Sequence, residues 1–218
     1  MNKTITVKGI GKASASPDYV ILSLGLKAQD KKYDQAMAQA AEQIQQLKDS
    51  LFQIGFERDA VKTTDFDVDT EYENVKDSFG NYTKVFRGYT VSHKIKLSFD
   101  FDMNSLSRSL SAISACLAHP SIGIQFTVKD ATAINEEMLR SAALNARRKA
   151  EILCDASGVK LGDLLAVDYN WAELNIYSQT DYRCCDDAMM LAPMCAPCDI
   201  QPDDIDVSDT ATFTWEIK

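Results

Sequence analysis

Histidine and positive charge are scarce in this chain of 218 residues. It contains two histidines, and 32 acidic residues outnumber 23 basic ones, which gives a formal net charge of −9. A negative field repels the phosphates of nucleic acids, so the composition argues against general nucleic-acid binding. The apolar stretch Tyr19–Leu24 is far too short to span a bilayer. We therefore expect no nucleic-acid partner and no membrane insertion.

Familiar catalytic motifs are also missing. The sequence shows no Ser/His/Asp order, no glycine-rich phosphate loop and no HExxH pattern. His93 falls on the apolar face of an expected hairpin, where a lone histidine is more often structural than catalytic. His119 precedes Pro120 in an expected turn and has no evident partner. We therefore expect a protein that is not an enzyme.

The chain opens without the pattern of an export signal. "MNKTITVKGIG" leads directly into alternating strand-like residues, without a basic start followed by an apolar run. The sequence as written therefore predicts a cytoplasmic protein. Disulfides are rare in that compartment, so the six cysteines are more readily explained as thiols or metal ligands than as a disulfide framework.

Periodicity along the chain predicts an α+β fold. Segments 4–13 and 19–28 read as strands, and an apolar stripe with spacings of three and four predicts a helix over 33–54. Continued to the end, the pattern gives the order ββαββαβαββ, with antiparallel-rich sheets and helices packed on them. The length suits a single domain, residues 1–218, with possible sub-halves 1–101 and 102–218. Cap residues are expected at Asp30, Asp102 or Asn104, and Asp130, with stop glycines at Gly55 and Gly158.

The last expected helix carries a ridge of small residues. Ala142, Ala146, Ala150 and Cys154 lie four positions apart and therefore on one side of the helix. Such a ridge lets a neighbouring backbone approach closely.

The stretches "TTDFDVDTEY" and "RGYTVSHKIKLSF" are expected to form a long β-hairpin. A two-residue turn at Gly80-Asn81 would set the register, with Val68 opposite His93 and Asp67 opposite Lys94. Acidic residues of one strand then face lysines of the other, which is typical of a solvated sheet face rather than a binding site.

The tip of this hairpin predicts self-association. The same register pairs Val75 with Phe86 and Phe79 with Tyr82, on the face that also holds Asp67. A hairpin of this length is expected to project beyond its sheet and expose the four apolar side chains. Exposed apolar patches rimmed by charge usually mark contact surfaces, and most soluble assemblies are homo-oligomers. The alternative is that the hairpin folds back over its own domain.

The segment "CCDDAMMLAPMCAPC", residues 184–198, concentrates sulfur. Cys195 and Cys198 form a CxxC, and Cys184 and Cys185 could complete a tetrahedral zinc site, while the neighbouring methionines favour copper(I). Adjacent cysteines are awkward ligands for one ion, and a reactive CxxC usually opens a helix. The surrounding prolines disfavour a helix here, so an uncommitted loop is weighed above both metal binding and a dithiol switch. We expect no cofactor, with zinc or copper at these four cysteines as the alternative.

Six stretches taken together resemble the SIMPL-domain family. They are "ITVKGIGKASASPDYVILSLGL", "LFQIGFERDAVKTTDFDVDTEY", "GYTVSHKIKL", "IGIQFTVKD", "ALNARRKAEILCDASGVKLGDLLAVD" and "VSDTATFTWEIK". The resemblance implies an α+β fold and relatives in the bacterial envelope and periplasm, some of them associated with oxidative stress. It implies no set of catalytic residues. Its recurrent glycines, such as Gly9 and Gly11, are expected to serve turns and packing. The chain is expected to differ from the family pattern in two respects, because its sequence as written opens without an export signal and contains a cysteine-rich segment.

Overall fold

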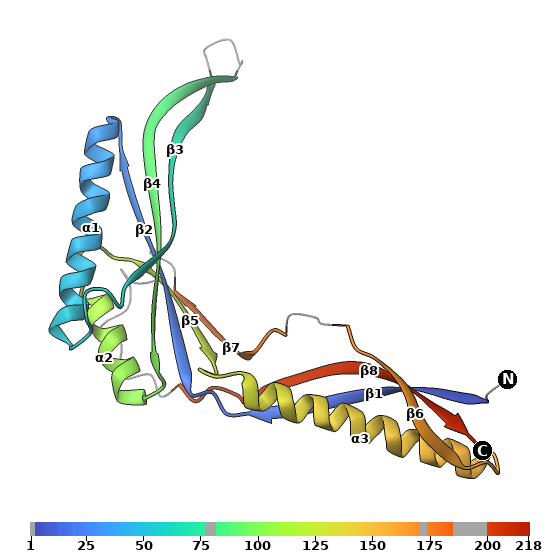
Figure 1. Ribbon diagram of the computed structural model, residues 1–218. Helices are drawn as coiled ribbons and strands as arrows, with labels where there is room; N and C mark the ends of the chain where they lie inside the picture. Colours follow the sequence, from blue (N-terminus) through green and yellow to red (C-terminus); the bar gives the residue numbers. More distant parts are fainter. Residues whose placement is uncertain (1–2, 77–81, 171–173, 185–199) are drawn as a thin grey trace. The chain divides into compact units, whose positions relative to one another are not determined.

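The structure is a computed structural model that describes residues 3–76, 82–170, 174–184 and 200–218 (Figure 1). The side chains at positions 181, 183 and 184 are outside this description. The elements in chain order are β1 (Thr4–Ala15), β2 (Tyr19–Asp30), α1 (Tyr33–Gln53), β3 (Lys62–Lys76), β4 (Tyr82–Asp100), α2 (Met103–Ser114), β5 (Ser121–Thr127), α3 (Thr132–Ala156), β6 (Leu161–Asp168), β7 (Tyr177–Cys184) and β8 (Ile205–Ile217). The predicted α+β class is confirmed.

The strands form two sheets. One has the strand order β1-β8-β6 and the other β3-β4-β2-β5-β7, so the consecutive strands β1 and β2 belong to different sheets. The β1–β8, β6–β8, β2–β4 and β3–β4 pairs are antiparallel. Strand β7 was not predicted, and it extends the expected order to ββαββαβαβββ.

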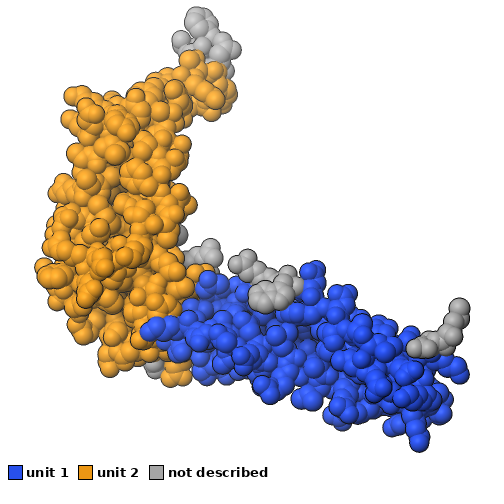
Figure 2. Space-filling model, in the orientation of Figure 1, with its two compact units in different colours: residues 1–18, 127–179, 202–218 blue, residues 19–126, 180–201 orange. Residues whose placement is uncertain are grey.

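Two compact units can be distinguished in the chain (Figure 2). Unit 1 comprises residues 1–18, 127–179 and 202–218, and unit 2 comprises residues 19–126 and 180–201. The boundaries of these units are not those of the halves 1–101 and 102–218. The single domain expected over residues 1–218 stays a prediction.

Unit 1 is built on the close approach of α3 to β1. The buried ridge Ala142, Ala146, Ala150 and Cys154 faces the sheet, as its spacing predicts. A Cβ added to Gly9 would run into the carbonyl oxygen of Ala142 and lie 2.8 Å from the Cβ of Ala146. Glycine therefore lets the helix backbone lie directly on the strand.

Unit 2 packs its helices on one face of the five-stranded sheet, on the same side of β2 and β4 (Figure 1). The alternate residues Leu22, Leu24 and Leu26 of β2 are buried on this side. They pack with Leu47 and Leu51 of α1 and with Leu106 and Ile113 of α2. The other face of β2 carries Ser23, Lys27 and Gln29, which are exposed. Ile21, on the same face, is buried, so β2 has a covered face and, from Ser23 onward, an open polar face.

The helix boundaries agree with the predicted cap and stop residues in most cases. Asp102 caps α2 by accepting a hydrogen bond from the backbone N–H of Ser105 at 2.8 Å, which lowers the pKa of its carboxyl group. Asp130 and Asp30 do not occupy the N-cap positions, which belong to Ala131 and Lys32. Both instead accept from the backbone N–H two residues later, at 2.9 and 2.8 Å. Gly55 and Gly158 have positive φ angles of 105° and 70°, as their role as helix stops requires.

The predicted register of the β3–β4 hairpin is wrong by two or three residues. Val68 lies opposite Val91 instead of His93, and Asp67 lies opposite Ser92 instead of Lys94. Tyr82 pairs with Lys76 instead of the predicted Phe79. The turn residues Gly80 and Asn81 themselves lie outside the described residues. Near the sheet the error is two residues, so the apolar and charged faces were assigned to the correct sides there.

Candidate functional site

The hairpin continues beyond the strand that supports it. Strand β2 ends at Asp30, which pairs with Tyr89 of β4. Beyond that point β4 pairs with β3 alone, from Tyr72 opposite Phe86 to Lys76 opposite Tyr82. We call this two-stranded part, residues 72–76 and 82–88, the arm. Figure 1 shows it passing the N-terminal end of α1.

A β-bulge marks the base of the arm. Glu71 pairs with Gly88 and Tyr72 pairs with Phe86, so Arg87 is an extra residue on β4. A Cβ on Gly88 would lie 2.6 Å from the carbonyl oxygen of Asp30, so glycine is needed for the strand to pass at this point. An extra residue reverses the alternation of side chains beyond it. The bulge therefore moves Phe86 to the face that holds Tyr89.

An aromatic row follows from this reversal. The ring of Phe86 makes edge contacts with Tyr89 at 5.3 Å and with Tyr72 at 5.8 Å between centroids. Tyr89 in turn makes an edge contact with Tyr33 of α1 at 5.6 Å. The row thus begins under the helix and runs outward along the arm.

The outer part of this row is not covered by the described residues. The exposed fractions are 58% for Tyr72, 43% for Phe86 and 72% for Tyr82. Lys76 lies opposite Tyr82, with its ammonium 5.8 Å from the ring centroid, and Lys84 shares the face by register. We call the face formed by these five residues the aromatic face of the arm.

The opposite face of the arm has a different character. Glu73 lies opposite Val85, and Val75 lies opposite Thr83. Glu73 also forms an exposed ion pair with Arg87 at 3.3 Å. We call Glu73, Val75, Thr83 and Val85 the aliphatic face of the arm.

The predicted contact residues therefore do not form one cluster. Tyr82 and Phe86 share the aromatic face, whereas Val75 lies on the aliphatic face, so the predicted Val75–Phe86 pair is wrong. Phe79 lies outside the described residues. Tyr72 was missed as a member of the site. The signal that could have found it is Gly88, because an isolated glycine within a strand often marks a bulge.

The acidic stripe at the base of the hairpin lies on the open face of the sheet. Asp65 accepts from Lys94 at 2.9 Å, which holds the pKa of the carboxyl below its usual value and raises the pKa of the lysine. Asp67 hydrogen-bonds Asp69 and raises the pKa of that second carboxyl. All three acids are exposed. Among the described residues, no group of three or more His, Cys, Asp or Glu side chains could hold a metal ion.

The two histidines occupy separate environments. His93 is half-buried beside Phe66, with 5.2 Å between ring centroids, and its Nε2 lies 2.8 Å from the Thr63 hydroxyl. Burial, together with Lys48, lowers its pKa. His119 is exposed and has a positive φ of 43° before Pro120. The structure thus places His93 on the helix-covered face, as predicted, and His119 in a turn.

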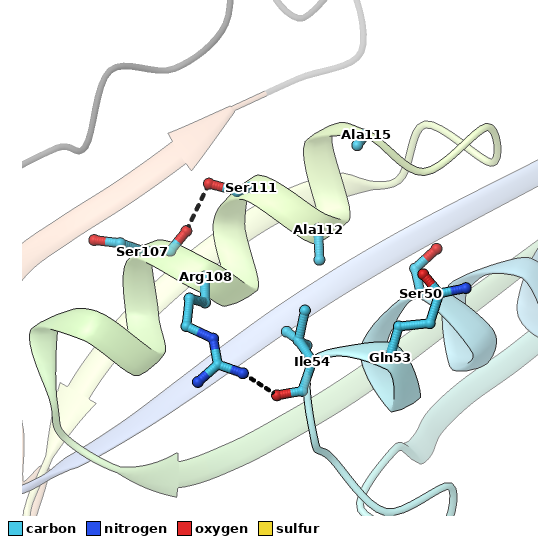
Figure 3. Close-up of a pocket in the computed structure, with 8 residues that line it drawn as sticks. All are labelled: Ser50, Gln53, Ile54, Ser107, Arg108, Ser111, Ala112 and Ala115. Atoms are coloured by element: carbon cyan, nitrogen blue, oxygen red, sulfur yellow. Dashed lines mark hydrogen bonds between the residues drawn. The ribbon is translucent and has the colours of Figure 1, made fainter.

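A shallow hollow of about 560 Å³ lies between α1 and α2 (Figure 3). Arg108 reaches across it and donates to the carbonyl oxygen of Ile54 at the end of α1. The hydroxyls of Ser50 and Ser111 donate to backbone carbonyls of their own helices at 3.0 and 2.8 Å. The side chains that line the hollow include no carboxylate, thiol or imidazole that could activate these hydroxyls.

A second hollow of about 400 Å³ lies in unit 1 between α3 and the β6–β8 side of the sheet. Phe213 and Trp215 line it with stacked rings, 5.6 Å between centroids. Arg147 and Glu151 at its rim pair with each other at 3.0 Å. The charged groups of Arg147 and Glu151 therefore neutralise each other.

The predicted metal ligands are not brought together by the described part of the chain. Cys184 ends β7, and its side chain is not described, while Cys185, Cys195 and Cys198 lie outside the described residues. Zinc or copper binding by these four cysteines stays a prediction. The remaining cysteines, Cys116 and Cys154, are buried free thiols in the two cores.

Sequence comparison assigns this chain to a known family. The model of the SIMPL family, described as proteins of unknown function (DUF541), matches residues 5–215. The chain belongs to the SIMPL family. The match covers both units, so the resemblance inferred from the six sequence stretches is confirmed.

Two SIMPL relatives carry descriptive names. The chain is 26% identical to the 26 kDa periplasmic immunogenic protein of Brucella abortus (strain S19) over 163 residues, which is 75% of this chain and 65% of that protein. The protein of the same name from Brucella melitensis biotype 1 is 25% identical over 163 residues, with the same coverage. The match therefore spans slightly less than two thirds of either relative.

Both relatives are named as periplasmic, in agreement with the exported members that the resemblance implies. The cytoplasmic location expected for this chain stays a prediction that its relatives do not support. Among the described residues, no helix combines the length and the apolar character that crossing a bilayer requires.

Proposed function

We propose that this SIMPL protein is a non-enzymatic, self-associating assembly protein, and that the aromatic face of its arm packs on a second copy of the chain. The observation that carries the proposal is the outward continuation of a core face. The face of the sheet that α1 covers at Tyr89 continues to Tyr72, Phe86 and Tyr82 without a covering element among the described residues.

The energetics of the arm support a partner. A two-stranded ribbon is only marginally stable in water unless it packs against another surface. No part of the arm pairs with β2, which ends at Asp30 opposite Tyr89. Burial of its exposed aromatic rings would stabilise both the ribbon and the complex.

Charge favours a second copy as that partner. The aromatic face carries Lys76 and Lys84, whereas the chain as a whole has a formal net charge of −9. A basic and aromatic face on an acidic protein is complementary to much of the surface of an identical molecule. Symmetric homo-oligomers are also the commonest assemblies of soluble proteins.

Light scattering on two matched double variants tests the proposal. Tyr82→Ser with Phe86→Ser removes two rings from the aromatic face, and Val75→Ser with Val85→Ser removes two side chains from the aliphatic face of the same ribbon. We expect the first variant to have the monomer mass of 24.2 kDa and the second to keep the wild-type oligomer mass.

Circular dichroism would confirm that both variants keep the wild-type fold. Equal masses for a folded aromatic-face variant and the wild type would refute the proposal. If only the aliphatic-face variant dissociated into monomers, the contact would lie on the aliphatic face, and the proposal would also be refuted.

A further inference from the structure

The edges of the two sheets are not equally available for pairing. The outer edge of β1 is closed by a polar column on α3. Asn145 Oδ1 accepts from the backbone N–H of Ile10 at 3.0 Å, and Ser141 Oγ accepts from that of Lys12 at 3.3 Å. One turn further along the helix, Lys149 donates to the carbonyl oxygen of Lys8 at 3.1 Å. These side chains take the place of a neighbouring strand.

The edge at β6 is poorly suited to pairing. Strand β6, over Leu161–Asp168, has two register irregularities within its eight residues. Irregularities of this kind twist an edge away from a flat partner.

The outer edge of β3 is long and regular. The strand runs from Lys62 to Lys76, and beyond its irregularity at Thr64 it continues to Lys76 without an extra residue of its own. No described strand pairs with its outer side. An unpaired row of backbone N–H and C=O groups of this length is a template for one more strand.

The side chains of β3 specify which strand would fit. Asp67, Asp69 and Glu71 lie on the open face of the sheet, and Phe66 and Val68 lie on the face that α1 covers. Among the described residues, Glu71 accepts from Gln29, and neither Asp67 nor Asp69 takes part in an ion pair. Phe66 is 47% exposed.

This pattern excludes a second β3 as the added strand. Antiparallel pairing of two β3 edges would place carboxylates opposite carboxylates, which is destabilising. The closed β1 edge of a second copy is not available either. The complementary strand needs basic side chains on one face and apolar side chains on the other.

We infer that the outer edge of β3, from Asp65 to Glu71, binds an extended segment of another protein whose side chains alternate between basic and apolar. The basic residues pair with Asp67 and Asp69, the apolar residues pack beside Phe66 and Val68, and the backbone extends the sheet. This surface is separate from the aromatic face of the arm, so the inference does not depend on self-association.

Fluorescence anisotropy with labelled, end-capped peptides tests the inference. The probe is the alternating peptide Lys-Val-Lys-Val-Lys-Val-Lys, and its control has the same side chains but is N-methylated at both its lysines and its valines, which blocks both backbone edges. We expect the full-length protein to bind the probe about tenfold more tightly than the control. Equal affinities would show attraction by charge alone and overturn the inference, as would the absence of binding.

Two charge-matched variants locate the site. Asp67→Asn with Asp69→Asn is expected to weaken binding of the probe by about tenfold, while Glu136→Gln with Glu137→Gln, on the exposed surface of α3, leaves it unchanged. Equal weakening by both pairs would overturn the inference. The probe should also slow amide hydrogen exchange in β3, and protection confined to other strands would contradict the proposed edge.

The same titration on the Tyr82→Ser, Phe86→Ser variant separates the two proposals. Peptide binding that persists in this variant, whatever its mass, supports the β3 site independently of the arm contact. Loss of peptide binding in the folded variant would contradict that independence.

Discussion

Phe86 packs edge-on against Tyr89 at 5.3 Å between ring centroids, although the two residues lie three positions apart on one strand. In a regular strand, residues three apart point to opposite faces. The extra residue Arg87 removes that opposition and brings both rings to the side of the sheet that α1 covers. A single bulge thus places Phe86 on the same side as the covered core face. That face continues beyond α1 as the exposed aromatic face of the arm.

Substitution of Gly9 by alanine tests the packing on which unit 1 depends. The added Cβ would meet the carbonyl oxygen of Ala142 and force α3 away from β1. Overpacking of this kind costs about 1 to 3 kcal/mol. We expect Gly9→Ala to lower the midpoint of urea denaturation accordingly.

Gly123→Ala provides the matched control for this prediction. The nearest atoms to a Cβ at Gly123 lie 3.8 Å away, at ordinary contact distance, so its effect should stay within about 0.5 kcal/mol. Equal denaturation midpoints for the two variants would show that the packing of α3 on β1 does not depend on Gly9.

The lowered pKa of His93 predicts a dependence of stability on pH. Burial disfavours the imidazolium form in the folded protein, and Lys48 adds to the effect, whereas the unfolded chain takes up the proton near pH 6.5. The unfolded state therefore binds more protons in this window. The stability that neutral His93 provides is present above pH 6.5 and is lost as the pH falls through the folded pKa.

Thermal melts between pH 5 and 8 would measure this effect against a His93→Gln variant. The wild type should lose more stability than the variant as the pH falls below about 6.5. Parallel profiles for the two proteins would show that His93 keeps an ordinary pKa.

Much of the local structure could be predicted because it depends on neighbours in the sequence. The cap at Asp102, the helix stops at Gly55 and Gly158 and the buried ridge of α3 all follow from residue type and spacing. These features are set within a few residues of the chain, so a single sequence is enough to identify them.

The candidate site depended on features that periodicity does not encode. The register of β3 and β4 was inferred from a two-residue turn, but Tyr82 pairs with Lys76 instead of Phe79. The bulge at Arg87 then reverses the faces of the β4 residues in the arm, while the β3 residues keep their alternation. Strand β7, "YSQTDYRC", was missed because its sequence has no apolar alternation, and its place at the edge of the sheet requires none.

The cysteine-rich segment carries a separate prediction about metal content. If Cys184, Cys185, Cys195 and Cys198 bind zinc or copper, protein purified under reducing conditions should contain one equivalent of metal, because four thiolates complete one tetrahedral site. Elemental analysis of the wild type and of a Cys195→Ser, Cys198→Ser variant would measure it. Metal-free wild type, with an unchanged melting temperature in the variant, would remove this alternative.

The mass of the wild-type protein in solution tests self-association most directly. Sedimentation velocity over a dilution series should show a species whose mass is a multiple of 24.2 kDa and which dissociates as the concentration falls. The aromatic face of the arm requires that result, because its exposed rings would otherwise stay in water. A mass of 24.2 kDa at every concentration would contradict the account.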